Sequence, residues 1–333
     1  MLRIHFTGED LTRVTVAARS DPLWDVLLSL HMVQEPDRSL AFSEWRRRTR
    51  ALRMPSVRPL LELARPWGYS PDFLTPGRGE ADFAHQLEDV LSTPRTQLSA
   101  ELSILAEESG PTPWIRELDG GDHQVMARLG DTLTAYHRVA LAPYQDQIRA
   151  HAEADRARRG LALLNGGVER LLAELHPRVR WEAPVLQIPV YADQDVYLEG
   201  RGLVLVPSFF CRIQPITLMD PHRPPVLVYP LSPRLGWLRP AAAAGDQGGM
   251  DPIVALLGRT RAHVLDAATA GGTTTELAVR VGVALPVISR QTSVLREAGL
   301  LDTRREGGSV RHHVTPLGIA LLNGELAADG TLG

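Results

Sequence analysis

The sequence has no lysine and only one cysteine, and both scarcities limit its chemistry. All 36 residues of the Lys and Arg class are arginines in a chain of 333 residues. Without lysine, no P-loop amine can contact a nucleotide phosphate and no Schiff base can form with a carbonyl substrate. Cys211 has no partner for an intramolecular disulfide. Its neighbours Phe209 and Phe210 predict a buried structural thiol, whereas Arg212 alone favours a redox-active one.

Long apolar runs and common catalytic motifs are missing too. No stretch approaches the apolar length that spans a bilayer, and the first residues lack the apolar core of a signal peptide. Neither an HExxH helix nor a GxSxG elbow occurs. We therefore expect a cytoplasmic protein that is not an enzyme and has no cofactor, no metal and no membrane partner. The net charge is −3, so any contact with DNA would depend on local placement of arginine.

The most informative segment lies near the C-terminus, where residues 273–283 predict a short helix and a turn. Thr273 and Glu276 have the spacing of a capping box, in which each side chain bonds a free backbone N–H at the start of a helix. Gly282 follows where the chain must turn, and glycine adopts a positive φ there at little cost. A second helix is predicted over residues 285–298, ended by a glycine.

Two short strands follow these helices, over residues 300–305 and 310–314. Residues 306–309 between them contain two glycines, which predicts a β-hairpin. A helix, a turn, a second helix and an arginine-rich hairpin form the order of a winged helix-turn-helix. In that fold the second helix enters the major groove of DNA.

The residues 287–291 and 294–301 resemble the recognition helix and its exit in bacterial regulators of the ArsR/SmtB type, and the resemblance covers about residues 251–323. It implies a dimer in which the outer helices pack across a two-fold axis. Ala284 stands where the family often has a capping Ser, which weakens the cap by about 1 kcal/mol. Metal-sensing relatives carry Cys pairs or His and carboxylate sets, and the matching helices here have neither. The long upstream region resembles the uncharacterised N-terminal extension of some actinobacterial regulators of this type.

The candidate DNA contacts lie early on the second helix and on the hairpin. Arg290 is the strongest candidate for a base contact, because arginine can donate two hydrogen bonds to guanine, and Val287 could meet a thymine methyl. The alternative roles are a phosphate contact for Arg290 and a bond to the protein backbone for Gln291. The hairpin arginines are expected to meet phosphates or the minor groove, or else to be solvated. The full candidate set is Leu285, Val287, Ser289, Arg290, Gln291, Arg304, Arg305 and Arg311.

The rest of the chain predicts an α+β protein of about two domains. Residues 1–240 are expected to form a mainly helical domain with a small β-sheet, residues 241–250 an Ala- and Gly-rich linker, and residues 251–333 the winged helix-turn-helix domain. Helices are expected over 22–32, 43–52, 55–63, 79–91, 98–108, 124–142, 143–165 and 168–175, and strands over 2–6, 179–181, 185–190, 196–198, 202–207 and 226–229.

The N-terminal domain leaves several interpretations open. It could stabilise a dimer, or sense a small-molecule effector in a pocket lined by its aromatic residues, which could equally be core: Trp24, Phe42, Trp45, Trp67, Tyr69, Phe73 and Trp114. The basic run 46–50 could be a solvated face or a second DNA contact. We expect a sequence-specific regulator, a repressor, that binds double-stranded DNA as a homodimer at an inverted repeat, with a non-metal input through the N-terminal domain. The alternative is an enzyme or protein-interaction module with an accessory winged helix.

Overall fold

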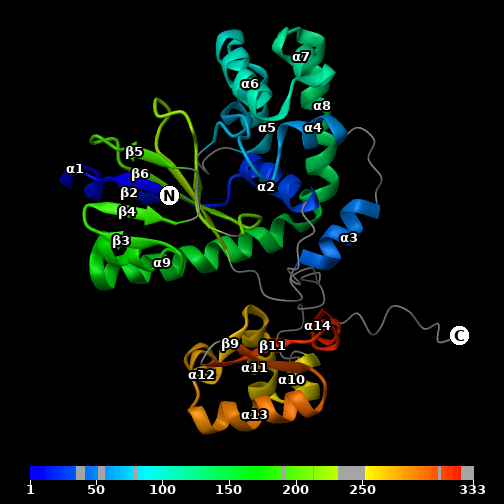
Figure 1. Cartoon of the computed structure of the whole chain (residues 1–333), viewed down its shortest axis with the longest axis vertical. Coiled ribbons are helices and arrows are strands. Elements are labelled where there is room, and N and C mark those ends of the chain that lie inside the picture. The colour runs from blue at the N-terminus through cyan, green and yellow to red at the C-terminus, as the bar shows by residue number, and fades with distance from the viewer. Residues whose placement is uncertain are drawn as a thin grey trace, which may run out of the picture. The chain divides into compact units, whose positions relative to one another are not determined.

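The computed structural model describes residues 1–34, 42–51, 57–77, 82–189, 193–212, 214–231, 252–306 and 309–323. Its contacts divide the chain into two compact units. Unit 1 comprises Met1–Asp37 and Arg46–Ser232, and unit 2 comprises Arg38–Trp45 and Pro233–Gly333. Both units combine helices with small sheets, so the fold class is α+β (Figure 1). The predicted linker 241–250 lies outside the described residues.

The first sheet of unit 1 has the strand order β3-β4-β1-β5. Its strands are β1 (Leu2–His5), β3 (Arg180–Glu182), β4 (Val185–Ile188) and β5 (Gln194–Tyr197). β1 pairs antiparallel with β4 and parallel with β5. Leu2 and Ile4 are fully buried, whereas the alternate residues Arg3 and His5 lie on the other face.

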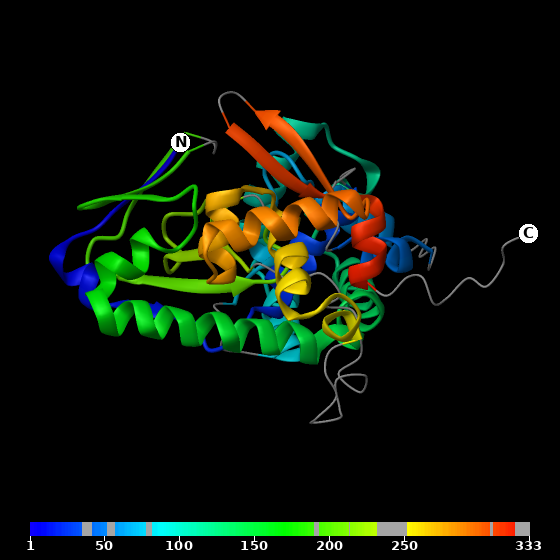
Figure 2. The ribbon, with the colours of Figure 1, turned by 90° about the horizontal axis from the view of Figure 1, so that it is seen from below.

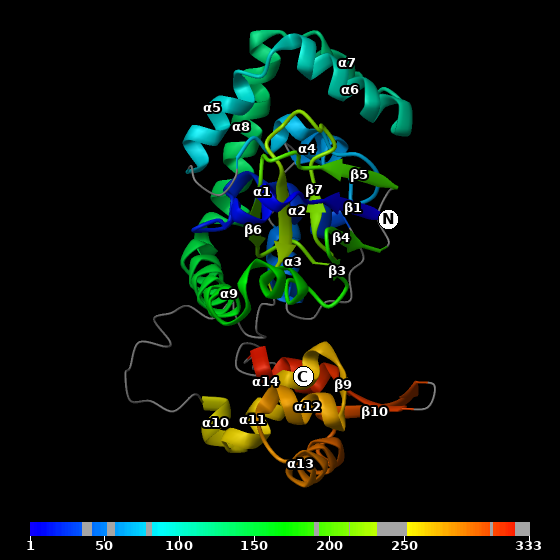
Figure 3. The ribbon, with the colours of Figure 1, turned by 90° about the vertical axis from the view of Figure 1, so that its left-hand side faces the viewer.

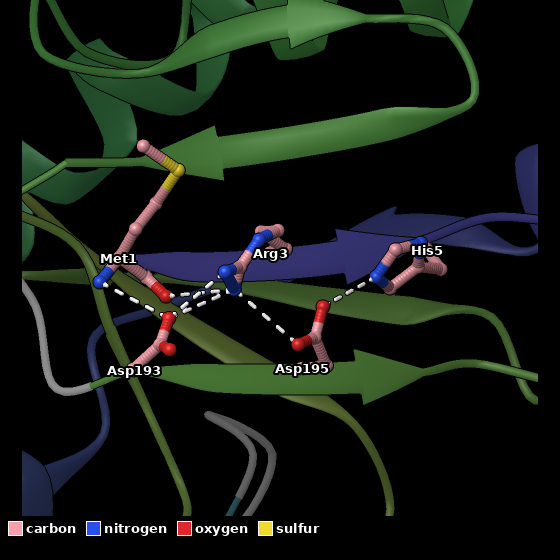
Figure 4. A network of polar contacts seen from close by, with 5 residues as sticks. All are labelled: Met1, Arg3, His5, Asp193 and Asp195. Carbon is pink, nitrogen blue, oxygen red and sulfur yellow. Dashed lines mark hydrogen bonds and ion pairs between the residues drawn. The ribbon is translucent and has the colours of Figure 1, made fainter.

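Polar side chains on that outer face connect β1 to β5 (Figure 4). The guanidinium group of Arg3 donates to Asp193 at 2.9 Å and to Asp195 at 3.3 Å. His5 Nε2 lies 2.7 Å from the other oxygen of Asp195, and the His5 ring stacks on Tyr197 at 4.4 Å. These contacts, with the hydrogen bond to His5 foremost, hold the pKa of Asp195 below its usual value. The network fixes the parallel pair β1–β5 at the surface.

The second sheet of unit 1 has the order β2-β6-β8-β7, where β2 is Val14–Val16, β6 Leu203–Ser208, β7 Ile216–Thr217 and β8 Val226–Pro230. β6 lies between the parallel neighbours β2 and β8, and β7 runs antiparallel to β8. All five residues of β8 are buried, as is usual for parallel strands covered on both faces. The expectation of a single small sheet is therefore wrong. Two sheets form, and each one takes a strand from the first sixteen residues.

The described helices of unit 1 agree in outline with the prediction. Figure 3 shows α5 to α8 gathered at one end of the strands. Their bounds are α1 Gly8–Thr12, α2 Pro22–Gln34, α3 Ser43–Ala51, α4 Arg58–Leu63, α5 Phe83–Leu91, α6 Arg95–Ser109, α7 Pro113–Asp119, α8 His123–Ala140 and α9 Gln145–Ala173, with η3 Asp72–Leu74 and η4 Ala142–Tyr144 as short 3₁₀ turns. α3 begins in unit 2 and ends in unit 1. The predicted helix starts at 55–56 and 79–81 lie outside the described residues.

The long helix α9 runs alongside the strands and contacts β2, β3 and β6 (Figure 2). Its helical geometry breaks at Gly166 and Gly167, where Gly167 has a φ of 66°, so the predicted interruption is confirmed. Beyond the break the chain folds back on Arg159, whose guanidinium group donates to the carbonyl oxygen of Leu175 at 2.8 Å. Arg159 also bonds Asp155, which accepts a 2.6 Å hydrogen bond from Tyr229 of β8. This buried network anchors α9 to the second sheet.

Unit 2 packs its helices around one small core. Leu265, Leu277, Ile288 and Leu295 are almost fully buried in it. The strand order of its sheet is β10-β11-β9. The elements are α10 Pro252–Leu257, α11 Arg259–Ala267, η6 Ala268–Ala270, β9 Gly272–Thr273, α12 Thr274–Val281, α13 Leu285–Glu297, β10 Leu301–Glu306, β11 Ser309–Val314 and α14 Pro316–Asn323. In neither unit is any described helix both long enough and apolar enough to span a membrane.

Candidate nucleic-acid interface

α12 begins and ends as its sequence predicts. The Thr273 hydroxyl accepts from the backbone N–H of Glu276 at 3.2 Å, and the Glu276 carboxylate accepts from the N–H of Thr273 at 3.1 Å. This reciprocal pair is the predicted capping box. Gly282 ends the helix in the left-handed conformation, with a φ of 72°. The turn at Gly282 directs the chain into α13 after only three residues.

α13 presents one face to the core and the opposite face to solvent. Ile288, Thr292 and Leu295 are buried. Because successive helical residues are about 100° apart, Arg290 lies near the middle of the opposite face. Arg290 is exposed, and it makes no hydrogen bond or ion pair with any other residue that the structure describes. Its guanidinium group is therefore available to an external acceptor.

The other candidates on α13 surround Arg290 at the start of the helix. Leu285 is 48% exposed and Val287 is 39% exposed. Ser289 is exposed, and its carbonyl oxygen accepts hydrogen bonds from side chains one turn later. The cap residue Ala284 makes no side-chain hydrogen bond to the helix. The start of α13 thus combines apolar and polar side chains on its exposed surface.

Gln291 is held by a side chain that the sequence did not indicate. Nε of Arg261, on α11, donates to the Gln291 side-chain oxygen at 3.0 Å. The two residues are thirty positions apart, so no local pattern could reveal the pair. The bond leaves the two Gln291 amide N–H groups, and the second lone pair of its side-chain oxygen, for a ligand. Gln291 bonds another side chain rather than the backbone.

The hairpin of β10 and β11 extends away from the helices of unit 2 (Figure 3). Its base is fixed by His312, which is 6% exposed. The two ring nitrogens of His312 each lie 3.1 Å from a threonine hydroxyl, Thr274 on α12 and Thr303 on β10. Burial, and next the charge of Arg296, lower the pKa of His312, which favours the neutral ring. His312 therefore has a structural role at the base of the hairpin.

The three hairpin arginines differ in their contacts. Arg304 donates from Nε to Asp302 at 3.1 Å and is 70% exposed. Arg311 lies 3.5 Å from Glu276 and is 30% exposed. Arg305 is exposed and makes no hydrogen bond or ion pair with the described part of the chain. Arg304 and Arg311 are directly paired across the two strands, so they lie on one face of the hairpin, and Arg305 lies on the other.

The local charge of residues 252–323, a part of unit 2, differs from that of the whole chain. Residues 252–323 contain eight arginines and five acidic residues, an excess of three positive charges. The whole chain has a net charge of −3. The remaining residues are accordingly acidic in sum. The basic excess is concentrated on the segment that carries α13 and the hairpin, where a polyanion would be attracted.

The aromatic residues that could line an effector pocket differ widely in their burial. Trp24 and Phe73 are buried in the core, whereas Trp67 is 71% exposed. An open hollow of about 490 Å³ is lined by Trp67 and by none of the other six aromatic candidates. Most of the other candidates are buried in the core.

The basic run of α3 and the lone cysteine also have structural contacts. Arg46 is buried, whereas Arg47 and Arg48 are exposed, and Nε of Arg50 donates to the carbonyl oxygen of Val33 at 3.2 Å. Cys211 is 2% exposed, and its thiol donates to the carbonyl oxygen of Gln214 at 3.3 Å. Burial raises the pKa of that thiol, as expected for a structural cysteine. No cluster of three metal-ligating side chains occurs within the described ranges.

Comparison with family models, with curated proteins and with solved structures finds no match to this chain. The candidate interface consists of an exposed arginine on α13 and a hairpin that carries three more arginines.

Proposed function

We propose that this protein is a sequence-specific DNA-binding transcriptional regulator whose unit 2 is a winged helix-turn-helix of the ArsR/SmtB type. In this proposal α12 and α13 form the helix-turn-helix and the β10–β11 hairpin forms the wing. One observation carries the proposal. The exposed face of α13, centred on Arg290, lies opposite a fully buried face, so the helix is rigidly held while its outer side chains remain available.

The chemistry of this face fits the major groove. The guanidinium group of Arg290 can donate two parallel hydrogen bonds to O6 and N7 of guanine. Val287 is 39% exposed, and its apolar side chain could contact a thymine methyl group. The free amide N–H groups of Gln291 can donate to a base or a phosphate, while Arg261 keeps its side chain oriented.

The hairpin supplies the contacts that depend on charge rather than sequence. Arg305 is exposed near the tip, and Arg304 and Arg311 lie on the opposite face. Phosphate contacts of this kind fix the position of a protein on the duplex without reading its sequence. The outer helices α10 and α14 expose Leu256 at 68% and Leu317 at 49%. Those residues support the dimer that the family resemblance implies, and a dimer would read an inverted repeat.

The decisive experiment is selection of duplexes from a random pool by the full-length protein, followed by footprinting. We expect an inverted repeat whose half-sites lie about one helical turn apart, and protection of both half-sites. The promoter nearest the protein's own gene is the first genomic candidate. If the folded protein enriches no sequence and protects none at moderate salt, the proposal is wrong. The variant Arg290→Ala serves as the matched control, because it removes only one exposed side chain.

A further inference from the structure

α9 has two opposite faces, and only one of them is used within unit 1. The first face is buried against the sheets: Ile148, Ala152, Asp155, Arg159 and Ala162. The opposite face is exposed and entirely apolar, and we call it the α9 stripe: Ala150, Ala154, Ala157, Leu161 and Leu164. Within the stripe Leu161 is 61% exposed and Leu164 is 83% exposed. Both leucines therefore contribute little to the core of unit 1.

The spacing of the α9 stripe is that of a seam between two helices. Its residues follow one another at alternating steps of four and three, the a and d positions of a heptad repeat. A single exposed leucine is ordinary at a protein surface. Five apolar residues that keep heptad spacing along four turns of an exposed face are not required by the packing of α9. The alanines at one end allow close approach of a second helix.

We propose that the α9 stripe is a contact surface for a second copy of this chain, with the two α9 helices parallel and in register about a two-fold axis. Charge complementarity selects the second copy as the occupant. In a parallel pair the residue before each a position faces the residue five places later on the other helix. Glu153 and Arg158 occupy those places and are 66% and 63% exposed. Each copy therefore offers both an acidic and a basic partner to the other.

An antiparallel pair would lack this complementarity. With the two stripes overlapped about Ala157, it would place Arg158 near Arg158 of the other copy and Glu153 opposite Gly160, so like charges would meet and the carboxylate would have no basic partner. Within the chain, Arg158 already bonds Asp155, and Glu153 lies 4.0 Å from Nε of Arg149. The guanidinium group has five N–H donors, so Arg158 can bond Asp155 and a second carboxylate together.

The size of the α9 stripe sets the strength of the contact. From Ala150 to Leu164 it spans about 21 Å at 1.5 Å per residue. An interface of standard size buries about 800 Å² on each partner, more than such a seam provides alone. We therefore infer reversible, concentration-dependent association, separate from α10 and α14. Association through the α9 stripe does not require DNA.

The first test measures association of the full-length chain by sedimentation velocity over a range of concentrations, without DNA. The double variant Leu161→Glu with Leu164→Glu should weaken association about tenfold or more, because it would bury unpaired charges in the seam. Leu163→Glu is the matched control. Leu163 is 42% exposed on the same turn but lies off the stripe, so this variant should associate like the wild type. Circular dichroism should show that all three proteins are folded.

The second test identifies the register by cross-linking. Cys211 is the only cysteine and is buried, so an introduced thiol is the accessible one. A short bismaleimide should link two copies of Ala150→Cys, and two copies of Leu164→Cys, but not two copies of Leu163→Cys. Equal linking at all three positions, or linking only between Ala150→Cys and Leu164→Cys in a mixture, would overturn the parallel seam. Association that is undetectable in the wild type, or unchanged in the double glutamate variant, would overturn the contact surface itself. If Ala150→Cys and Leu164→Cys each cross-link as expected but the wild type selects no duplex, only the regulatory function is refuted.

Discussion

Arg290 and Arg305 are both exposed arginines, but their positions in unit 2 predict different effects on duplex binding. Arg290→Ala should cost about 1–3 kcal/mol on the selected duplex and relax the preference at one base position. Arg305→Ala should weaken binding to all duplexes by a similar factor. It should also reduce the dependence of the binding constant on salt concentration by the amount expected for one phosphate contact. Fluorescence anisotropy with selected and random duplexes at several salt concentrations separates the two. If Arg290→Ala weakens binding to the selected and the random duplex equally, Arg290 contacts a phosphate rather than a base.

At the same scale, helical periodicity was sufficient to find the exposed side chains of α13 but not their partners. The position of Arg290 follows from counting 100° per residue away from Ile288. The bond between Arg261 and Gln291 joins α11 to α13, so it depends on how those helices pack. The burial of Arg46, in a run whose other arginines are exposed, also depends on packing. Tertiary contacts therefore decide which members of a polar run reach solvent.

At the scale of elements, α13 lacks a side-chain cap at its N-terminus. Ala284 has the extended backbone of an N-cap, with φ −66° and ψ 146°, but no side-chain oxygen. Ala284→Ser should bond a free N–H of the first turn and stabilise unit 2 by about 1 kcal/mol, which slows amide exchange in α13 about fivefold. Hydrogen exchange of the full-length chain measures this. Ala298→Ser at the other end of α13 meets no free N–H groups and should leave exchange unchanged. Equal effects of the two substitutions would exclude a capping role.

Elements with several turns of consistent pattern could be predicted, and very short ones could not. Asp21 and Pro22 are typical residues for a helix start and so predict the helix over 22–32, and Asp21 accepts from the N–H groups of the first turn. α7 has only seven residues, too few for a clear period, although Thr112 caps it. β2 has three residues, and its pairing with β6 joins positions 14 and 203. Such distant pairing leaves no local signal, which is why one sheet was expected where two form.

At the scale of the whole molecule, a buried carboxyl group makes the stability of unit 1 depend on pH. Asp25 on α2 is 2% exposed and accepts from the hydroxyl of Ser208 at 2.6 Å and from the N–H of Phe209 at 3.2 Å. Burial raises the pKa of Asp25 to about 7, from an ordinary value of 3.8. The bonds tie α2 to the end of β6, in the middle of unit 1.

Asp25 and His312 should consequently make pH-dependent contributions of opposite sign to the stability of their units. The raised pKa of Asp25 means that the folded state holds its proton more tightly than the unfolded state. Its contribution to the stability of unit 1 is present below pH 3.8 and is lost as the pH rises through about 7, at up to about 1.4 kcal/mol per pH unit. The lowered pKa of His312 has the reverse sign, so unit 2 should lose stability as the pH falls below 6.5, the ordinary pKa of histidine.

Urea titrations of the full-length chain between pH 5 and 8, followed by amide resonances of Tyr229 in unit 1 and Leu277 in unit 2, test these signs separately. Asp25→Asn keeps an oxygen that accepts from Ser208 and Phe209 but cannot ionise. It should therefore remove the Asp25 contribution to the pH dependence at Tyr229 and leave the dependence at Leu277 unchanged. Burial lowers the pKa of His31 in the same unit to about 4, a contribution of opposite sign that both proteins share, so the comparison of the two proteins isolates Asp25. A free energy of unfolding at Tyr229 that changes with pH identically in the wild type and in Asp25→Asn would show that Asp25 is not a controlling group. Asp72, whose pKa burial raises to about 6, is then the next carboxyl group of unit 1 to replace.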